Sequence, residues 1–121
     1  MTGPAQQRGA RAESKALEYL KQQGLRLIEK NFNCRHGEID LIMYENETLV
    51  FVEVRYRAKD APVGALESVN MRKQQRIARS AQFYLQRHPD LAWRYCRFDV
   101  LGVSGQHSEQ PFEWVRDAFQ V

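Results

Sequence analysis

Two acidic residues, Asp40 and Glu53, lie on either side of a short polar stretch, 45–48, at a spacing that would bring their carboxylates together. Each belongs to a β-rich segment in which charged residues alternate with apolar ones, and the stretch between them is typical of a hairpin turn. A symmetric turn centred on Asn46 and Glu47 pairs the two segments so that Asp40 directly faces Glu53.

The same turn places Glu38 opposite Arg55, and the two-residue repeat of a strand then puts all four side chains on one face. Carboxylates directly opposite one another, with Cβ atoms about 4.5–5.5 Å apart, destabilise a sheet unless something offsets their charge. Mg²⁺ offsets it, since this ion is bound through one or two carboxylates, water and phosphate. The alternatives are a slipped register or two solvated acids on an exposed sheet face.

A third acid, Glu13, falls on the apolar side of a helix predicted from about Arg8 to Gln23 and closed by Gly24. The apolar stripe of this helix consists of Ala10, Leu17 and Leu20. Because an unpaired buried carboxylate is costly, the position of Glu13 indicates a functional role. The alternative is that Glu13 only favours the positive N-terminal end of the helix.

The composition is that of a single globular domain of 121 residues, with 43% hydrophobic and 27% charged residues. We expect a disordered tail over residues 1–7 and one domain over residues 8–121. No stretch approaches the roughly 18 apolar residues of a membrane span, and the N-terminus has no apolar signal core. A cytoplasmic protein without membrane association is therefore expected.

A second helix is predicted from about Ser68 to Arg87, and it lies in the most basic part of the chain. Between residues 69 and 98 there are seven basic residues and one acid. Arg72, Arg76 and Arg79 recur on one helical face, with Lys73 at its margin. A basic face without interleaved acids favours contact with phosphates, although a solvated helix face would have the same pattern.

The order of predicted elements is a helix, three strands, a helix and a fourth strand over residues 96–103. The first three strands are joined by short connections and are expected to be antiparallel. The helical crossover lets the fourth strand run parallel to the third. Residues 112–119 are expected to anchor the C-terminus to the core. The fold class is thus α/β, with a mixed four-stranded sheet flanked by helices.

This pattern resembles the restriction-endonuclease-like nuclease superfamily, whose signature is an Asp, a variable spacer and then Glu-x-Lys on the next strand. Here it maps to Asp40, twelve intervening residues, Glu53, and Arg55 in the lysine position. The chain is more closely similar to the YraN-like family of uncharacterised bacterial proteins. The matching residues are Glu13, Asn31, the block 37–42, the run 51–55, Lys73, Arg76, the run 97–100, Trp114, Ala118 and Phe119.

The resemblance implies a fold close to Holliday junction resolvases and a metal-dependent endonuclease acting on structured or branched DNA. Mg²⁺ or Mn²⁺ would be held by Glu13, Asp40 and Glu53. The partner would be nucleic acid, DNA rather than RNA, and a homodimer is compatible with cutting two strands. Residues expected to contact the nucleic acid are Arg57, Arg72, Lys73, Arg76 and Arg79.

Arg55 departs from the superfamily pattern in a way that affects the expected chemistry. An arginine stays protonated and presents a planar fork, so it is a poor general base but a good clamp for phosphate or carboxylate. Arg55 would either stabilise the transition state or pair with Glu38, and Glu38 would either orient the attacking water or only partner Arg55. The alternative function is therefore a nucleic-acid-binding module of the same fold, catalytically weak or inactive.

Overall fold

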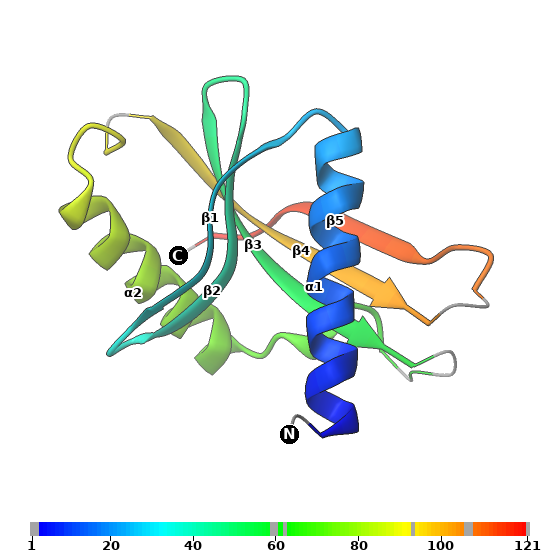
Figure 1. Ribbon diagram of the computed structural model, residues 1–121. Coiled ribbons are helices and arrows are strands. Elements are labelled where there is room, and N and C mark those ends of the chain that lie inside the picture. The colour runs from blue at the N-terminus through cyan, green and yellow to red at the C-terminus, as the bar shows by residue number, and fades with distance from the viewer. Residues whose placement is uncertain (1–2, 59–60, 62, 93, 106–107, 121) are drawn as a thin grey trace.

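The computed structural model describes residues 3–58, 61, 63–92, 94–105 and 108–120. In this part of the chain the strands form one sheet in the order β1-β2-β3-β4-β5 (Figure 1). No helix found there is long and apolar enough to cross a membrane. The elements are α1 (Pro4–Gln22), β1 (Arg26–Cys34), β2 (Gly37–Glu45), β3 (Thr48–Arg57), the 3-10 turn η1 (Leu66–Ser68), α2 (Met71–Arg87), β4 (Tyr95–Ser104) and β5 (Phe112–Phe119).

The α/β class and the order helix, three strands, helix, strand are confirmed, but the sheet has five strands rather than four. The additional strand is β5, the segment that the sequence suggested only as a C-terminal anchor. It pairs antiparallel with β4 from Val103 and Phe112 to Phe98 and Phe119. The pairing covers the outer edge of β4, whose backbone groups would otherwise be open to another chain.

The predicted hairpin register between β2 and β3 is confirmed. The pairs run from Glu45 with Thr48 at the turn to Leu41 with Val52, and Asn46 in the turn has a left-handed φ of 56°. The predicted parallel pairing of β3 with β4 is also confirmed. These two ladders place the acidic end of β2 beside the C-terminal half of β3.

The first helix begins at Pro4, so the expected disordered tail over residues 1–7 is wrong from residue 4 onward. Residues 1 and 2 lie outside the part of the chain that the structure describes. The helix ends at Gln22, one residue before the predicted Gln23, and Gly24 closes it as predicted, with a φ of 100°. The amide of Leu25 donates to the carbonyl oxygen of Leu20 at 3.0 Å and that of Gly24 to the carbonyl oxygen of Lys21 at 3.1 Å, which are the two hydrogen bonds of a Schellman cap.

Each helix covers one face of the sheet, and the two cores differ in their residues. The buried residues of α1 are Ala12, Ala16 and Leu20, which pack on Leu41, Met43, Val50, Val52, Leu101 and Val103. The face of α2 packs Ala81 and Tyr84 against Ile42 and Phe51. The buried stripe of α1 is thus rotated from the predicted one, which leaves Glu13 half-buried at its margin.

The second helix begins at Met71 rather than Ser68, because an asparagine caps it. Asn70 has an extended backbone, and its side-chain oxygen accepts a hydrogen bond from the amide of Lys73 at 2.9 Å. The residues before this cap form η1 instead of a first helical turn. The cap fixes the phase of α2, and it therefore decides which way Lys73 projects.

Candidate active site

Asp40 and Glu53 lie directly beyond the last recorded pair of the β2–β3 ladder, Leu41 with Val52. Beyond this pair the amide of Val54 donates a hydrogen bond to Oδ2 of Asp40 at 2.8 Å, so a side-chain oxygen takes the place of a backbone acceptor. Asp40 and Glu53 line the same hollow on the α2 side of the sheet. The predicted facing of the two carboxylates therefore follows from the confirmed register.

The two carboxylates lie together away from water, and this changes the protonation of Asp40. Glu53 is only 5% exposed and Asp40 is half-buried. Burial, and after it the negative charge of Glu53, raise the pKa of Asp40 to about 8, although the hydrogen bond from Val54 opposes the change. At neutral pH without a cation, Asp40 therefore tends to hold a proton.

Lys73 is the basic partner of this pair. Its Nζ lies 2.8 Å from Oε2 of Glu53, with the lysine side chain 40% exposed and the glutamate side chain 4% exposed. The sequence suggested that Lys73 contacts phosphates from the margin of a basic helix face. The structure places it in the carboxylate site, where it lines the hollow together with Asp40 and Glu53.

Arg55 is held by the segment before α2. Its Nε donates to Oγ of Ser68 at 3.0 Å, its Nη2 donates to the carbonyl oxygen of Ser68 at 3.4 Å, and its Nη1 is 3.8 Å from Glu53. The considered pairing of Arg55 with Glu38 is not among the recorded ion pairs of the described residues. The side chain of Arg55 runs toward Ser68 instead, and Glu38 is exposed.

Asn31 connects the two outer acids of the site. This residue of β1 has a left-handed φ of 55°. In the amide orientation that satisfies its neighbours, Nδ2 donates to Glu13 at 2.6 Å and to Glu38 at 3.3 Å. Burial, and then the charges of Glu38 and Glu53, raise the pKa of Glu13. Sequence reasoning gave Asn31 no role, although asparagine is unfavourable inside a strand and would have been a signal.

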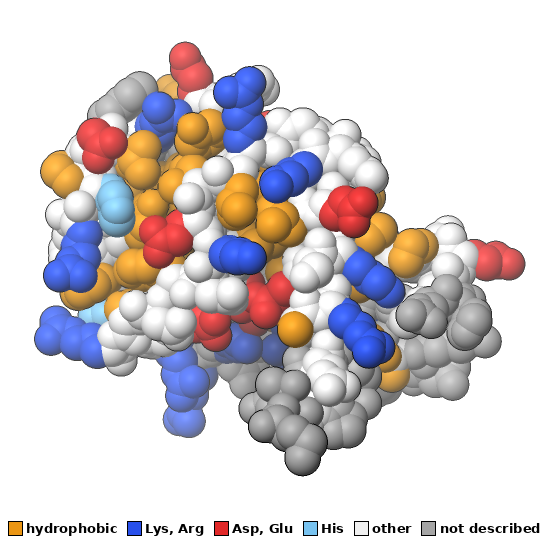
Figure 2. All heavy atoms as spheres, in the orientation of Figure 1, with side chains coloured by type: hydrophobic (Ala, Val, Ile, Leu, Met, Phe, Trp, Pro, Cys, Tyr) orange, Lys and Arg blue, Asp and Glu red, His pale blue; other side chains and the backbone are white. Residues whose placement is uncertain are grey.

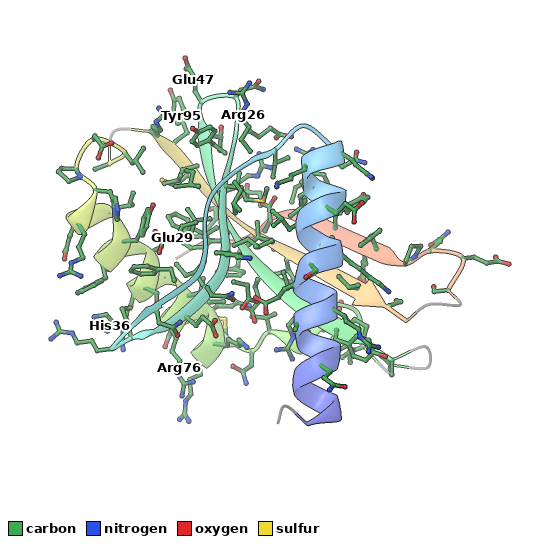
Figure 3. The ribbon with its side chains drawn as sticks, in the orientation of Figure 1. Arg26, Glu29, His36, Glu47, Arg76 and Tyr95 are labelled. Carbon is green, nitrogen blue, oxygen red and sulfur yellow. The ribbon has the colours of Figure 1, made fainter. Side chains whose placement is uncertain are left out.

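The central hollow has a volume of about 240 Å³. Figure 2 shows acidic side chains next to one another in the lower centre of the visible face, with basic side chains around them. Arg76 also borders the hollow, and Figure 3 shows it pointing outward at the end of the molecule where His36 lies. The residues that line this hollow are Gly37, Glu38, Asp40, Glu53, Lys73, Arg76 and Ile77.

The adjacent carboxylates of Asp40 and Glu53 suit Mg²⁺ or Mn²⁺, because such an ion keeps several waters and takes further oxygens from substrate phosphates. The implied ligand set of Glu13, Asp40 and Glu53 is not assembled as a group. Among the described residues no three His, Cys, Asp or Glu side chains are placed to hold an ion. The donor chemistry thus fits an ion on Asp40 and Glu53, with Glu13 engaged by Asn31.

The expected nucleic-acid contacts divide into two groups. Arg72, Arg76 and Arg79 are exposed on α2, as the helical spacing predicted. Arg57 is turned away from such a role, because its Nη2 donates to the carbonyl oxygen of Val63 at 2.5 Å and ties the following loop to β3. The basic surface beside the carboxylates is therefore formed by α2.

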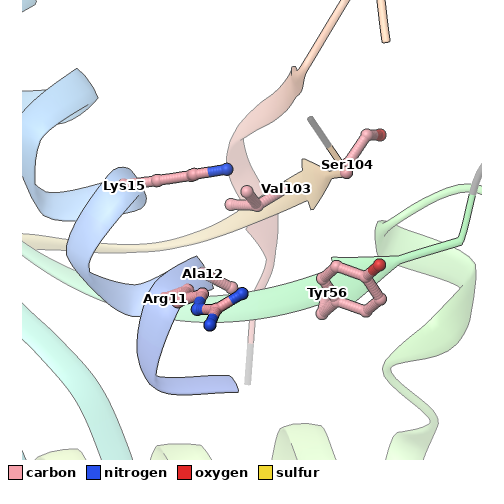
Figure 4. A pocket seen from close by; sticks show the side chains of 7 residues that line it. Arg11, Ala12, Lys15, Tyr56, Val103 and Ser104 are labelled. Atoms are coloured by element: carbon pink, nitrogen blue, oxygen red, sulfur yellow. The ribbon is translucent and has the colours of Figure 1, made fainter. Parts of the chain in front are cut away.

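A second hollow, of about 180 Å³, lies between α1 and the ends of β3 and β4. Figure 4 shows Arg11 and Lys15 on the helix side of this hollow and Tyr56 and Ser104 on the strand side. Two cations and two hydroxyl groups around an apolar floor are suited to a phosphate group. None of these residues was singled out from the sequence.

The five-stranded mixed sheet with two helices, with acids where β2 and β3 part, defines a protein with an α/β core of the nuclease-like kind. Comparison with known families then gives the particular group. The model of uncharacterised protein family UPF0102 matches residues 12–103. The chain therefore belongs to this family.

Related bacterial proteins match almost the whole chain. A UPF0102 protein of Stutzerimonas stutzeri is 47% identical over 116 residues, which cover 96% of this chain and 97% of the relative. One from Pseudomonas savastanoi is 48% identical over 115 residues, 94% of each chain. One from Alcanivorax borkumensis is 47% identical over 112 residues, 92% of this chain and 90% of the relative.

Proposed function

We propose that this protein is a metal-dependent endonuclease that hydrolyses phosphodiester bonds in structured or branched DNA. The observation that carries the proposal is the buried pair of Asp40 and Glu53, with a lysine in contact and a basic helix alongside. A carboxyl group whose pKa is raised to about 8 in a hollow is typical of a functional site.

Asp40 and Glu53 would hold the ion, and a bound Mg²⁺ or Mn²⁺ supplies a Lewis acid and a more acidic water. The chain itself would position the substrate. Arg72, Arg76 and Arg79 present charge to consecutive phosphates of a backbone, which gives affinity without sequence preference. Glu38, exposed at the rim, is placed to accept a hydrogen bond from a water molecule.

The proposed reaction is hydrolysis at a backbone phosphate. The oxygen of a water molecule forms a bond to phosphorus while the bond from phosphorus to O3′ breaks. The attacking water loses its proton to solvent, and the leaving O3′ takes a proton from solvent. The products are a 5′-phosphate and a 3′-hydroxyl, and Lys73, in contact with Glu53, would stabilise the charge that develops on the phosphoryl oxygens.

The direct test is cleavage of a labelled panel of a four-way junction, a flap, a duplex, single-stranded DNA and structured RNA. Each substrate is incubated with Mg²⁺, Mn²⁺ or EDTA. Asp40→Asn and Glu53→Gln, purified identically, serve as matched variants. We expect metal-dependent cutting, strongest on branched DNA, that both variants lose by about 1,000-fold. Cutting that survives both substitutions would point to a contaminating nuclease.

The alternative is a nucleic-acid-binding module of the same fold. The ion pair between Lys73 and Glu53 favours it, because this pair already neutralises one carboxylate without a metal ion. In that case the junction is bound but not cut, with an affinity that falls steeply with salt as phosphate contacts are lost. Junction binding that is intact in EDTA, together with no cutting in either metal, would support this alternative.

A further inference from the structure

We propose that Lys73 supplies the ammonium group that Arg55 cannot supply from the strand, and that Arg55 instead positions the segment from which Lys73 extends. This inference deepens the proposed function and rests on it. In this proposal the ammonium group of Lys73 contacts the reacting phosphate and the attacking water. Arg55 becomes a positioning residue that acts through Ser68 and the start of α2.

The placement of Lys73 carries the first half of the proposal. Its ammonium group contacts the buried carboxylate of Glu53 at 2.8 Å, although it comes from a different element. Lys73 is the third residue of α2, and its own amide is bound by the capping side chain of Asn70. The backbone under the lysine is thus fixed, while its four-carbon side chain keeps the freedom to move its charge.

The contacts of Arg55 carry the second half. Two of its donors are used by Ser68, which also donates from Oγ to the carbonyl oxygen of Ala65 at 2.6 Å. Ser68 ends η1, and only Val69 separates it from Asn70, the cap of α2. By binding Ser68, the guanidinium of Arg55 fixes the position of η1 and with it the position of the first turn of α2. Arg55 therefore acts on the carboxylate site mainly by delivering Lys73 to Glu53.

The chemistry of the two cations explains the division of roles. An ammonium group is a compact charge with three rotatable donors, whereas a guanidinium is a rigid fork suited to planar, fixed partners. A divalent cation held by Asp40 and Glu53 would weaken the ion pair between Lys73 and Glu53, and the ammonium group of Lys73 would then be available to the phosphate and the attacking water. The fork of Arg55 stays on Ser68, where a lysine would make fewer hydrogen bonds.

The kinetic test compares Lys73→Ala with Arg76→Ala and Arg55→Lys on the preferred substrate. Lys73 and Arg76 border the same hollow, and both variants remove one positive charge. We expect Lys73→Ala to lower kcat about 100-fold with little change in KM. Arg76→Ala should mainly raise KM, and Arg55→Lys should not raise kcat. A Lys73→Ala variant that changes only KM, or a tenfold gain from Arg55→Lys, would overturn the proposal.

A second measurement does not depend on cutting, so it separates failure of this inference from failure of the proposed function. Thermal unfolding is followed in EDTA and across a titration of Mg²⁺ or Mn²⁺. Removing the lysine takes away the nearer cation of Glu53 and leaves only Arg55, whose Nη1 is 3.8 Å away. Lys73→Ala should therefore melt lower in EDTA and gain more from the ion than wild type or Arg76→Ala. Equal gains in all three proteins would refute the role of Lys73, even if the wild-type protein cuts no substrate.

Discussion

Asp99 and Asp40 are both withdrawn from water in this sheet, one fully and one partly, and their surroundings are opposite. Asp99 in β4 is fully buried and accepts four hydrogen bonds. Asp40 in β2 is half-buried, accepts one hydrogen bond from the Val54 amide, and faces a second carboxylate. The difference teaches that burial alone does not mark a functional acid; what marks it is the lack of groups that stabilise its charge.

The partners of Asp99 come from three places in the chain. Arg97 donates from Nε and Nη2 at 3.0 and 3.2 Å, Trp114 donates from Nε1 at 2.9 Å, and the amide of Asp117 donates at 2.9 Å. Arg97 also donates to Glu45 at the end of β2. This network joins β5 to the rest of the sheet, so the run 97–100 that resembles the family pattern has a structural role here.

Asp99→Asn should have the largest effect on stability. The substitution removes the charge that Arg97 faces and replaces one acceptor oxygen by a donor, which leaves a nearly buried guanidinium poorly compensated. Breaking a buried pair typically costs about 3–5 kcal/mol. Urea unfolding of the variant and the wild-type protein in EDTA would give this difference. An unchanged midpoint would show that the network contributes little to stability.

The same substitution at Asp40 should raise the free energy of unfolding instead of lowering it. Because the pKa of Asp40 is about 8 in the fold and lower in the unfolded chain, ionising it destabilises the folded protein as pH rises. Asp40→Asn should match wild type below about pH 4 and become progressively more stable than wild type as the pH rises to 8, because a difference of one in pKa corresponds to about 1.4 kcal/mol. Urea unfolding in EDTA at several pH values measures the difference. Parallel pH curves for the two proteins would contradict this expectation.

Trp114→Phe should lower stability less than Asp99→Asn, and it tests a single hydrogen bond to Asp99. It removes one donor to Asp99 and keeps an aromatic ring beside Tyr19, whose centroid lies 6.1 Å from that of Trp114. Loss of a hydrogen bond to a charged group costs about 1.5–3 kcal/mol, so we expect the lower part of this range. A double-mutant cycle with Asp99→Asn, followed by urea unfolding, isolates the hydrogen bond. Strict additivity in that cycle would show that it contributes nothing.

The sequence was sufficient to predict the carboxylate pair, because its position depends only on local pattern. A polar turn between two alternating segments fixes the register, and the register fixes which residues face one another. Asp40 and Glu53 were therefore predicted together correctly. The exposed face of Arg72, Arg76 and Arg79 was predicted for a similar reason, since helical spacing alone decides it.

The sequence was not sufficient where a side chain chooses between partners on different elements. Arg55 was expected near Glu38 by strand register, but a long side chain reaches several positions, and η1 offers it better hydrogen bonds. The buried stripe of α1 was misplaced because the way a helix rolls on a sheet depends on the packing of both surfaces. The strand β5 was missed because its pairing depends on the free edge of β4.

By itself, then, the sequence determined the order of elements, the facing carboxylates and the basic helix, all of which follow from periodicity along the chain. Only the tertiary structure decided that Lys73 reaches Glu53, that Arg55 binds Ser68, and that Asn31 bridges Glu13 and Glu38. These contacts join residues from separate elements. They depend on the distance and angle at which those elements pack, and no pattern within one segment contains that information.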